Sequence, residues 1–307
     1  MSAVGRFAPS PSGRMHLGNA FTALLAWLSI RSRGGELVLR MEDLDPERCR
    51  PEYAARLRDD LLWLGLGWDR EQTPQSRRTD AYRAAFAALR AGGLVYPCYC
   101  SRADLHAASA PHASDGRAVY PGTCRSLTEA ERAAKTKPPA WRLIVPDREF
   151  SFTDGLRGEV RENLARESGD FIVRRADGVY AYQLAVVADD AEAGVTEVVR
   201  GADLLDSTPR QLYLQELLGL PSPRYFHTPL LLAPDGRRLS KREGSLDLGE
   251  LRRRCPPEVL TGYLAFLAGL CPPGLSVSPA ELARDFSWDR VAKEDRVVDP
   301  NAEIRGK

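Results

Sequence analysis

Residues 6–19 place charged, hydroxyl, imidazole and amide side chains in one short loop that could bind an anionic ligand. The segment runs Arg6-Phe7-Ala8-Pro9-Ser10-Pro11-Ser12-Gly13-Arg14-Met15-His16-Leu17-Gly18-Asn19. Its arginines supply charge for anions, its prolines stiffen the loop, and its glycines let a ligand approach the backbone. The glycine spacing matches neither G-x-G-x-x-G nor GK[ST], the two common phosphate fingerprints. A plain turn, with His16 as a capping or packing residue, is the alternative.

A predicted amphipathic helix over residues 20–33 positions this loop. One face of the helix carries Phe21, Leu24, Leu25 and Leu28, and a short apolar piece precedes the loop. The expected order is therefore strand, loop, helix. In open α/β sheets, the phosphates of a nucleotide meet the helix N-terminus at that junction, where His16 and Asn19 stand.

Three carboxylates follow a second predicted strand at residues 36–41. Apolar residues alternate in this strand, which completes a βαβ unit. Glu42, Asp43 and Asp45 come directly after it, at the end of the strand where α/β proteins collect their chemistry. An acidic turn in which Asp45 caps a helix explains the same residues.

The rest of the chain alternates strands and helices, which favours an α/β fold. Helices are predicted at 51–66, at 77–90, after the cap Ser207-Thr208-Pro209, and over 248–307; strands at 141–145, 150–153, 171–175, 195–200 and 225–232; and residues 179–187 as an apolar strand that runs into a helix. Trp63 and Trp68 are interpreted as packing residues.

Three of the six cysteines, Cys98, Cys100 and Cys124, lie close together in the sequence. Thiolates in this spacing suit tetrahedral Zn²⁺, which takes four ligands at a structural site. By ligand chemistry alone, His106 or His112 is the obvious fourth ligand. Reduced, buried cysteines without a metal are the alternative. A zinc site would stabilise a loop-rich insertion that has few apolar residues of its own.

The composition indicates a globular protein of balanced charge. The 307 residues suffice for two domains, and 43 basic against 42 acidic residues give a net charge of +1. Any contact with nucleic acid must therefore use local patches. Residues 1–5 form no signal core, and no stretch approaches the ~20 apolar residues of a membrane span. We expect a cytoplasmic protein that makes no membrane contact and has no disulfide framework.

The complete loop resembles the start of the class I glutamyl-tRNA synthetase catalytic domain, R-F-A-P-S-P-(S/T)-G-x-x-H-x-G. Its H-x-G-N stands for the HIGH signature, although Leu17 and Asn19 depart from those letters. The second class I signature, KMSKS, has its counterpart in Arg238-Leu239-Ser240-Lys241-Arg242. The resemblance implies catalytic roles for His16, Asn19 and Lys241. It also implies a site for ATP, with Mg²⁺, made of His16, Gly18, Asn19, Ser240 and Lys241.

Three further motifs of this family imply a site for L-glutamate. Glu42 stands in R-x-E-D-x-D, Tyr182 in A-Y-x-L-A-V-V-x-D-D, and Arg200 in V-x-R-G-A-D-L. The implied site adds the residues Arg6, Phe7, Ala8, Pro9 and Ser10. An arginine fork on the side-chain carboxylate discriminates strongly against the neutral amide of glutamine. Without the family, Arg200 would be interpreted as a surface or capping arginine.

The resemblance also implies the domain organisation. We expect an α/β, Rossmann-type catalytic domain at 1–93 and 181–246, an inserted zinc-containing subdomain at 94–180, and a helical stem-contact-like region at 247–307. Short bacterial homologues pair C-x-C with Y-x-x-x-C. Tyr120 is therefore the implied fourth ligand of one structural Zn²⁺, beside Cys98, Cys100 and Cys124.

Complete glutamyl-tRNA synthetases continue into a helical anticodon-binding part, which we expect this protein to lack. The resemblance is accordingly to their short paralogues, the glutamyl-Q tRNA(Asp) synthetases. It implies activation of L-glutamate with ATP without any tRNA, and transfer of the glutamate to the queuosine base at the wobble position of tRNA(Asp). A monomer is expected. We find no motif that reads queuosine.

Three other functions fit parts of the sequence. A compact glutamyl-tRNA synthetase that charges tRNA(Glu) would use the same active site. Other class I nucleotidyltransferases share an H-x-G-H pattern, but Asn19 replaces the second histidine, and residues 6–13 argue against them. A non-catalytic tRNA-binding relative would have no need of His16 and Lys241.

Overall fold

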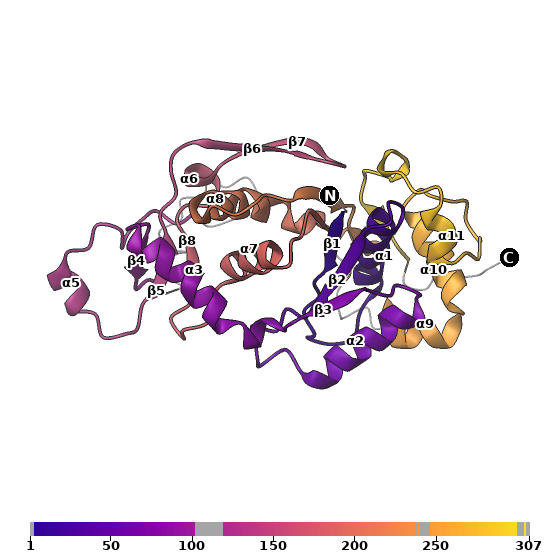
Figure 1. The fold of residues 1–307 in the computed structure, drawn as a ribbon, viewed down its shortest axis with the longest axis horizontal. Helices are drawn as coiled ribbons and strands as arrows, with labels where there is room; N and C mark the ends of the chain where they lie inside the picture. The colour runs from indigo at the N-terminus through magenta and orange to yellow at the C-terminus, as the bar shows by residue number, and fades with distance from the viewer. Residues whose placement is uncertain (1–2, 102–118, 238, 240–245, 300–303, 305–307) are drawn as a thin grey trace.

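The structure is a computed structural model that describes residues 3–101, 119–237, 239, 246–299 and 304. At its centre is a five-stranded parallel sheet in the order β10-β9-β1-β2-β3 (Figure 1). Its strands are β1 (Val4–Phe7), β2 (Glu36–Arg40), β3 (Arg70–Gln72), β9 (Glu197–Gly201) and β10 (Arg224–Thr228). Three helices connect them: α1 (Leu17–Arg31), α2 (Pro51–Trp63) and α8 (Thr208–Leu218).

The direction in which strands are added reverses beside β1. The chain first builds outward through β2 and β3, and later returns to place β9 and β10 on the other side of β1. Open α/β sheets bind ligands outside the carboxyl ends of the strands at such a switch point. The loop after β1, which the sequence singled out, lies at this point.

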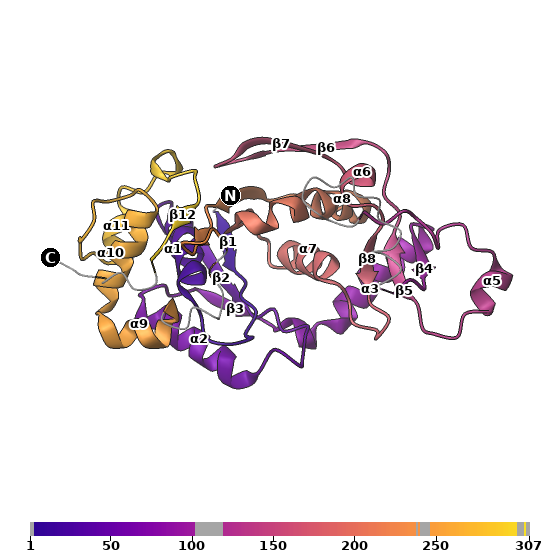
Figure 2. The ribbon, with the colours of Figure 1, turned by 180° about the vertical axis from the view of Figure 1, so that it is seen from behind.

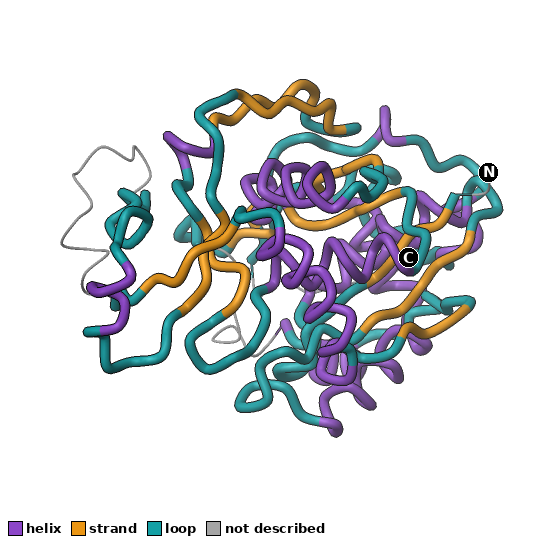
Figure 3. The backbone as a smooth tube through the Cα atoms, turned by 60° about the vertical axis from the view of Figure 1, so that its left-hand side comes forward, coloured by secondary structure: helices purple, strands orange, loops and turns teal. Residues whose placement is uncertain are grey.

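A large insertion between β3 and β9 fills the other end of the molecule (Figures 1 and 2). Its strands are β4 (Val95–Cys98), β5 (Ala140–Leu143) and β8 (Phe171–Arg174) in one antiparallel sheet, with β6 (Glu149–Asp154) and β7 (Gly158–Asn163) as a hairpin. Its helical segments are η1 (Gln75–Arg77), α3 (Thr79–Ala91), α5 (Glu129–Ala133), α6 (Leu164–Glu167) and α7 (Tyr182–Glu192). Strands and loops dominate the far end of the insertion (Figure 3).

The C-terminal part covers α1 on the side away from the sheet (Figure 1). It contains α9 (Leu248–Arg254), α10 (Pro257–Leu267), α11 (Pro279–Ala283), the 3₁₀ helix η4 (Trp288–Arg290) and β12 (Arg296–Val297). The expected helical region is therefore correct only in part, because β12 pairs in parallel with β11 (Leu231–Leu232). Since α1 packs on the sheet and on α10 and α11, it is buried on most of its surface and not on one face only.

Several predicted elements differ from the structure. Residues 179–187 form no strand beyond an isolated bridge at Tyr180, and α7 begins at Tyr182. The predicted strand 225–232 is interrupted between β10 and β11 at Pro229, which has no N–H to donate. Ser207 occupies the N-cap position of α8 but makes no side-chain cap, because its backbone is already helical (φ −76°, ψ −22°); its hydroxyl accepts from Gln183.

Two large apolar clusters hold these parts together. One joins the sheet, α1, α2 and the C-terminal helices, and Trp63 and Trp68 pack against it as predicted. The other joins α3, α7 and α8 to the strands of the insertion. In the part of the chain that the structure describes, no helix combines the length and apolar character of a membrane span.

Candidate active site

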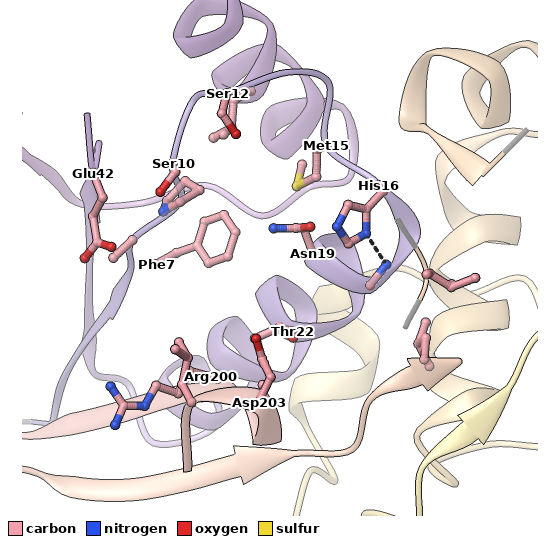
Figure 4. A pocket seen from close by; sticks show the side chains of 18 of the residues that line it. Phe7, Ser10, Ser12, Met15, His16, Asn19, Thr22, Glu42, Arg200 and Asp203 are labelled. Carbon is pink, nitrogen blue, oxygen red and sulfur yellow. Dashed lines mark hydrogen bonds between the residues drawn. The ribbon is translucent and has the colours of Figure 1, made fainter. Parts of the chain in front are cut away.

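A pocket of about 510 Å³ opens at the carboxyl ends of β1, β2 and β9 and at the start of α1. Every described residue that was predicted to bind ATP or glutamate lines it: Arg6, Phe7, Ala8, Pro9, Ser10, His16, Gly18, Asn19, Glu42, Tyr182 and Arg200. His16 and Asn19 stand at one end, and Glu42 and Arg200 at the other (Figure 4). Ser240 and Lys241 lie outside the described residues, but their neighbour Leu239 lines the same pocket.

His16 is the N-cap of α1, and its ring is held by the helix that it begins. The Gly18 N–H donates to His16 Nδ1 at 3.2 Å, so a neutral His16 ring carries its proton on Nε2. Because this nitrogen caps the helix through its own lone pair, the other ring nitrogen is the one that can donate toward a phosphate.

The chain that follows the KMSKS-like segment attaches to the His16 loop. The backbone of Asp247 forms an isolated antiparallel bridge with His16, and Leu248 N donates to the carbonyl of Met15 at 2.9 Å. The start of α9 is therefore joined by backbone hydrogen bonds to the loop that carries His16.

Arg200 is a buried guanidinium whose hydrogen bonds all go to neutral groups. Only 4% of Arg200 is exposed, and its Nε, Nη1 and Nη2 donate to His227 Nε2 at 3.0 Å, Gln211 Oε1 at 2.8 Å and Thr208 Oγ1 at 2.8 Å. A buried charge costs stability unless an opposite charge compensates it. Two of its five N–H groups, one on each terminal nitrogen, remain for an anion in the pocket.

Glu42 belongs to a buried network of opposite charges at the same end of the pocket. Arg40, which has no exposed surface, donates to Glu42 Oε1 at 3.1 Å and to Asp190 Oδ1 at 2.6 Å. Asp190 Oδ1 also lies 3.6 Å from Arg6 Nε. Burial raises the pKa of Glu42 even though Arg40 and Arg6 oppose the shift. A cationic group in the pocket would therefore find an acidic partner in Glu42 and would favour its ionised form.

Tyr182 lines the same pocket and is influenced by the charges of Glu42 and Arg200. Burial, with the nearby charge of Glu42, raises the pKa of Tyr182, so its phenol stays protonated and can donate. A carboxylate acceptor, a phenol donor and a guanidinium fork together suit a ligand that bears both an ammonium group and carboxylates.

The three predicted cysteine ligands also converge. The sulfurs of Cys98, Cys100 and Cys124 all lie within 4.8 Å of one another. The hydroxyl of Tyr120 lies 3.4 Å from Cys98 Sγ and 3.9 Å from Cys100 Sγ. Around a tetrahedral zinc with Zn–S of about 2.3 Å, sulfurs are about 3.8 Å apart, and Cys100 and Cys124 are separated by 3.6 Å. The spacing fits one tetrahedral metal; His106 and His112 lie outside the described residues.

The pKa values of the cysteine thiols in this cluster are also consistent with a bound cation. Burial raises the pKa of Cys98, but hydrogen bonds from Tyr120, the Cys100 backbone and Arg142 more than offset it and leave the pKa below its ordinary value. Burial and the neighbouring sulfurs raise the pKa of Cys100 to about 12. One thiolate is thus stabilised by protein groups, while a second needs a positive charge between the sulfurs, which Zn²⁺ would supply.

Two residues at this site were missed from the sequence. His227 accepts a hydrogen bond from Arg200, and Asp154 in turn contacts His227, with His227 Nδ1 2.6 Å from Asp154 Oδ2. His227 sits in an apolar strand just before Pro229, at a carboxyl end where α/β sites collect their chemistry, which was the available signal.

The order of the strands in the parallel sheet reverses at β1, and the pocket lies at the loop and helix that follow this strand. These features define the catalytic domain of a class I tRNA synthetase. A family model described as tRNA synthetases class I (E and Q), catalytic domain, matches residues 3–298, and the chain belongs to this family. Within it, the chain is similar to glutamyl-Q tRNA(Asp) synthetases. It is 52% identical over 305 residues to the one from Symbiobacterium thermophilum, covering 94% of each chain, and 51% identical over 290 residues to the one from Nitratidesulfovibrio vulgaris, covering 90% of each.

A solved structure supports the same fold. The crystal structure of a glutamate tRNA ligase from Elizabethkingia meningosepticum, in complex with its amino acid, aligns with a TM-score of 0.81 at 27% identity. The alignment covers 97% of this chain and 67% of that one.

Proposed function

We propose that this protein activates L-glutamate with ATP without any tRNA and transfers the glutamate to the queuosine base at the wobble position of tRNA(Asp). It is thus a ligase that modifies a tRNA. The overall reaction is supported by the names of relatives whose sequences are 52% and 51% identical to this chain. The observation that carries glutamate as substrate is the buried Arg200, whose hydrogen bonds go only to neutral groups at one end of the pocket.

The residues at that end divide the recognition of glutamate. The two remaining N–H groups of Arg200 bind the side-chain carboxylate, and Glu42 binds the ammonium group. Tyr182 donates its phenol proton, and the segment Arg6 to Ser10 forms the wall. Glutamine would leave the guanidinium without its counter-charge, which is the physical basis of selection for glutamate.

Catalysis of the first step is positioning and charge stabilisation. A carboxylate oxygen of glutamate attacks the α-phosphorus of ATP in line. The new O–P bond forms as the bond to pyrophosphate breaks, which gives glutamyl-adenylate. His16, Asn19 and the N-terminus of α1 bind the phosphates, with Gly18 giving access to the backbone, and Lys241 with Ser240 neutralises the departing pyrophosphate. Mg²⁺ bound with ATP supplies further positive charge.

The second step moves the glutamyl group to the tRNA. A hydroxyl of the cyclopentenediol ring of queuosine attacks the carbonyl carbon of the adenylate, an ester forms, and AMP leaves. The anticodon loop occupies the place where a synthetase holds an acceptor end. We expect the monomer to be the acting form.

A structural Zn²⁺ completes the proposal. Cys98, Cys100, Cys124 and Tyr120 would hold it, far from the pocket, and it would fix the loop-rich part of the inserted subdomain at 94–180. It takes no part in the two chemical steps. The division into catalytic halves at 1–93 and 181–246 and a stem-contact-like region at 247–307 belongs to the same proposal.

The first step can be tested by ATP–pyrophosphate exchange in the absence of tRNA. We expect exchange that depends on glutamate and is not supported by glutamine. Lys241→Ala should lower its rate roughly 100-fold or more, as for loss of one group that stabilises transition-state charge. Lys293→Ala, in the C-terminal part, should leave the rate unchanged. Exchange in Lys241→Ala at the wild-type rate would contradict the assigned role.

A further inference from the structure

Behind Arg200 lies a buried histidine–aspartate pair that the reaction scheme does not use. Arg200 Nε donates to His227 Nε2 at 3.0 Å, and His227 Nδ1 lies 2.6 Å from Asp154 Oδ2. The side chains of His227 and Asp154 are both fully buried. The pair joins two parts of the chain, since Asp154 ends β6 in the insertion and His227 lies in β10 of the parallel sheet.

The partners of His227 fix its tautomer. A guanidinium has no acceptor, so His227 Nε2 must carry a lone pair and no proton. A neutral His227 ring then carries its proton on Nδ1, which donates to Asp154. Burial lowers the pKa of His227 despite the opposing carboxylate, so the ring is neutral near pH 7. The hydroxyl of Thr208, 3.3 Å from Nε2, accepts from Arg200 and can donate to the same lone pair.

The orientation of Asp154 is fixed as well. Its Oδ1 accepts from the backbone N–H groups of Leu156 at 3.0 Å, Arg157 at 2.9 Å and His227 at 3.3 Å. Only Oδ2 is left to face the ring of His227. The carboxylate therefore cannot turn without losing three backbone hydrogen bonds, and it imposes the Nδ1–H tautomer.

We propose that Asp154 and His227 are positioning residues that set the direction of the Arg200 guanidinium and thereby the selectivity for glutamate over glutamine. The proposal rests on the assignment of Arg200 as the ligand of the glutamate side chain. Its physical content is that three acceptors, on His227, Gln211 and Thr208, hold three N–H groups of Arg200 and so determine where the remaining two point. Small displacements of a positioning group are costly, because a fork must meet both oxygens of a carboxylate.

Asp154→Asn is the sharpest test. Because Oδ1 must still accept three backbone N–H groups, the new amide nitrogen faces His227 Nδ1 and donates to it. The ring proton then moves to Nε2 and opposes the N–H of Arg200. We expect the KM for glutamate to rise roughly tenfold or more, as for one lost hydrogen bond to a charged group, and discrimination against glutamine to fall. The KM for ATP should be unchanged.

The histidine itself provides a second pair of variants. In His227→Gln, the longer side chain can place an amide oxygen near the position of Nε2, whereas in His227→Asn the amide is too short to reach Arg200. The KM for glutamate should therefore rise less in the Gln variant than in the Asn variant. Asp147→Asn is the matched control: it neutralises an exposed carboxylate of the insertion that accepts from Asn163, remote from Arg200.

The tautomer can be read without any assay of activity. The chain has four histidines, so ¹⁵N-histidine NMR can assign the ring nitrogens of His227. We expect a protonated Nδ1 in the wild type and a protonated Nε2 in Asp154→Asn. A wild-type ring protonated on Nε2 would overturn the proposal. So would an unchanged KM for glutamate in Asp154→Asn, or an equal loss for glutamate and ATP that follows a lower unfolding temperature.

Failure of the proposed function would look different. It would appear as wild-type protein that shows no glutamate-dependent exchange, while the NMR tautomers still report on the Asp154–His227–Arg200 arrangement. The expected tautomers without any change in glutamate binding would reject the positioning role alone.

Discussion

At the scale of single residues, the uncompensated charge of Arg200 is the most informative feature of the pocket. Buried guanidinium groups are ordinarily paired with carboxylates, as Arg40 is with Asp190 and Glu42. Arg200 is surrounded by His227, Gln211 and Thr208, which orient it without neutralising it. A buried charge without a counter-charge lowers the folding stability, and an anionic ligand in the pocket would compensate it.

Arg200→Lys tests whether the fork itself matters. Lysine keeps the charge but loses the planar pair of donors. We expect the KM for glutamate to rise roughly 10- to 100-fold, the loss of one or two charged hydrogen bonds, with little change in the KM for ATP. Steady-state pyrophosphate exchange measures both. Arg224→Lys, at an exposed arginine of β10, is the control. Equal KM values in wild type and Arg200→Lys would remove Arg200 from the glutamate site.

The sequence predicted Arg200 but not the residues that hold it. Arg200 stands in a motif, whereas Asp154 and His227 are 73 positions apart and meet only after the insertion folds against β10. Asp190 does stand in the motif that contains Tyr182, but its pairing with Arg40 across 150 positions could not be predicted. Local patterns report the chemistry of a side chain and its nearest neighbours along the chain, and long-range pairs of this kind leave no local trace.

At the scale of elements, the apolar strands and helices were predictable and the polar ones were not. β1, β2 and β9 are buried and apolar, so their patterns are clear. β3 consists of Arg70, Glu71 and Gln72 and is an edge strand, and β7 is largely exposed, so neither shows apolar alternation. These two strands form because their backbones hydrogen-bond to a neighbouring strand, and their side-chain pattern contributes little.

One glycine in the C-terminal part makes a sharp test of helix packing. A Cβ at Gly262 in α10 would lie 1.6 Å from the carbonyl oxygen of Leu275, a backbone atom that cannot rotate away. Gly262→Ala should therefore lower the free energy of unfolding by about 1–3 kcal/mol, as measured by chemical denaturation. At Gly67 a Cβ would meet no atom within 4 Å. Gly67→Ala should leave the stability nearly unchanged, and a similar loss in both variants would contradict the packing.

The cysteine cluster makes a prediction about metal content. Purified protein should contain about one equivalent of zinc, as for one four-ligand structural site, and Cys98→Ser/Cys100→Ser should lose it. Cys271→Ser, at a cysteine whose thiol donates to Gly262 O, should retain it. Elemental analysis of the three proteins decides the matter. Unchanged zinc in the double variant would exclude these ligands, and Tyr120→Phe tests the fourth.

At the scale of the whole molecule, the insertion and the C-terminal part both pack against the sheet that carries the pocket. The insertion contributes Asp154 behind Arg200, and Gly155 N donates to the carbonyl of Tyr225 at 2.8 Å. The C-terminal part pairs β12 with β11 and stacks Trp288 on Phe226 with ring centroids 4.5 Å apart. Strand β10 of the parallel sheet is thus in contact with both the insertion and the C-terminal part.

The order of the pocket-forming segments along the chain could be predicted, because each segment carries a motif. How the insertion and the C-terminal part pack against them could not be predicted. The Arg6–Asn19 loop, Glu42, Tyr182 and Arg200 were placed together from motifs, and they share the pocket. The net charge of +1 says nothing about where tRNA binds, and no motif reads queuosine.

Transfer of labelled glutamate to three RNAs tests the central claim most directly. The RNAs are tRNA(Asp) with queuosine, the same tRNA without it, and tRNA(Glu). We predict labelling of the first alone, at the anticodon and dependent on ATP. Labelling of tRNA(Glu) would mean a compact synthetase that charges an acceptor end, and labelling of tRNA(Asp) regardless of queuosine would contradict the proposed acceptor.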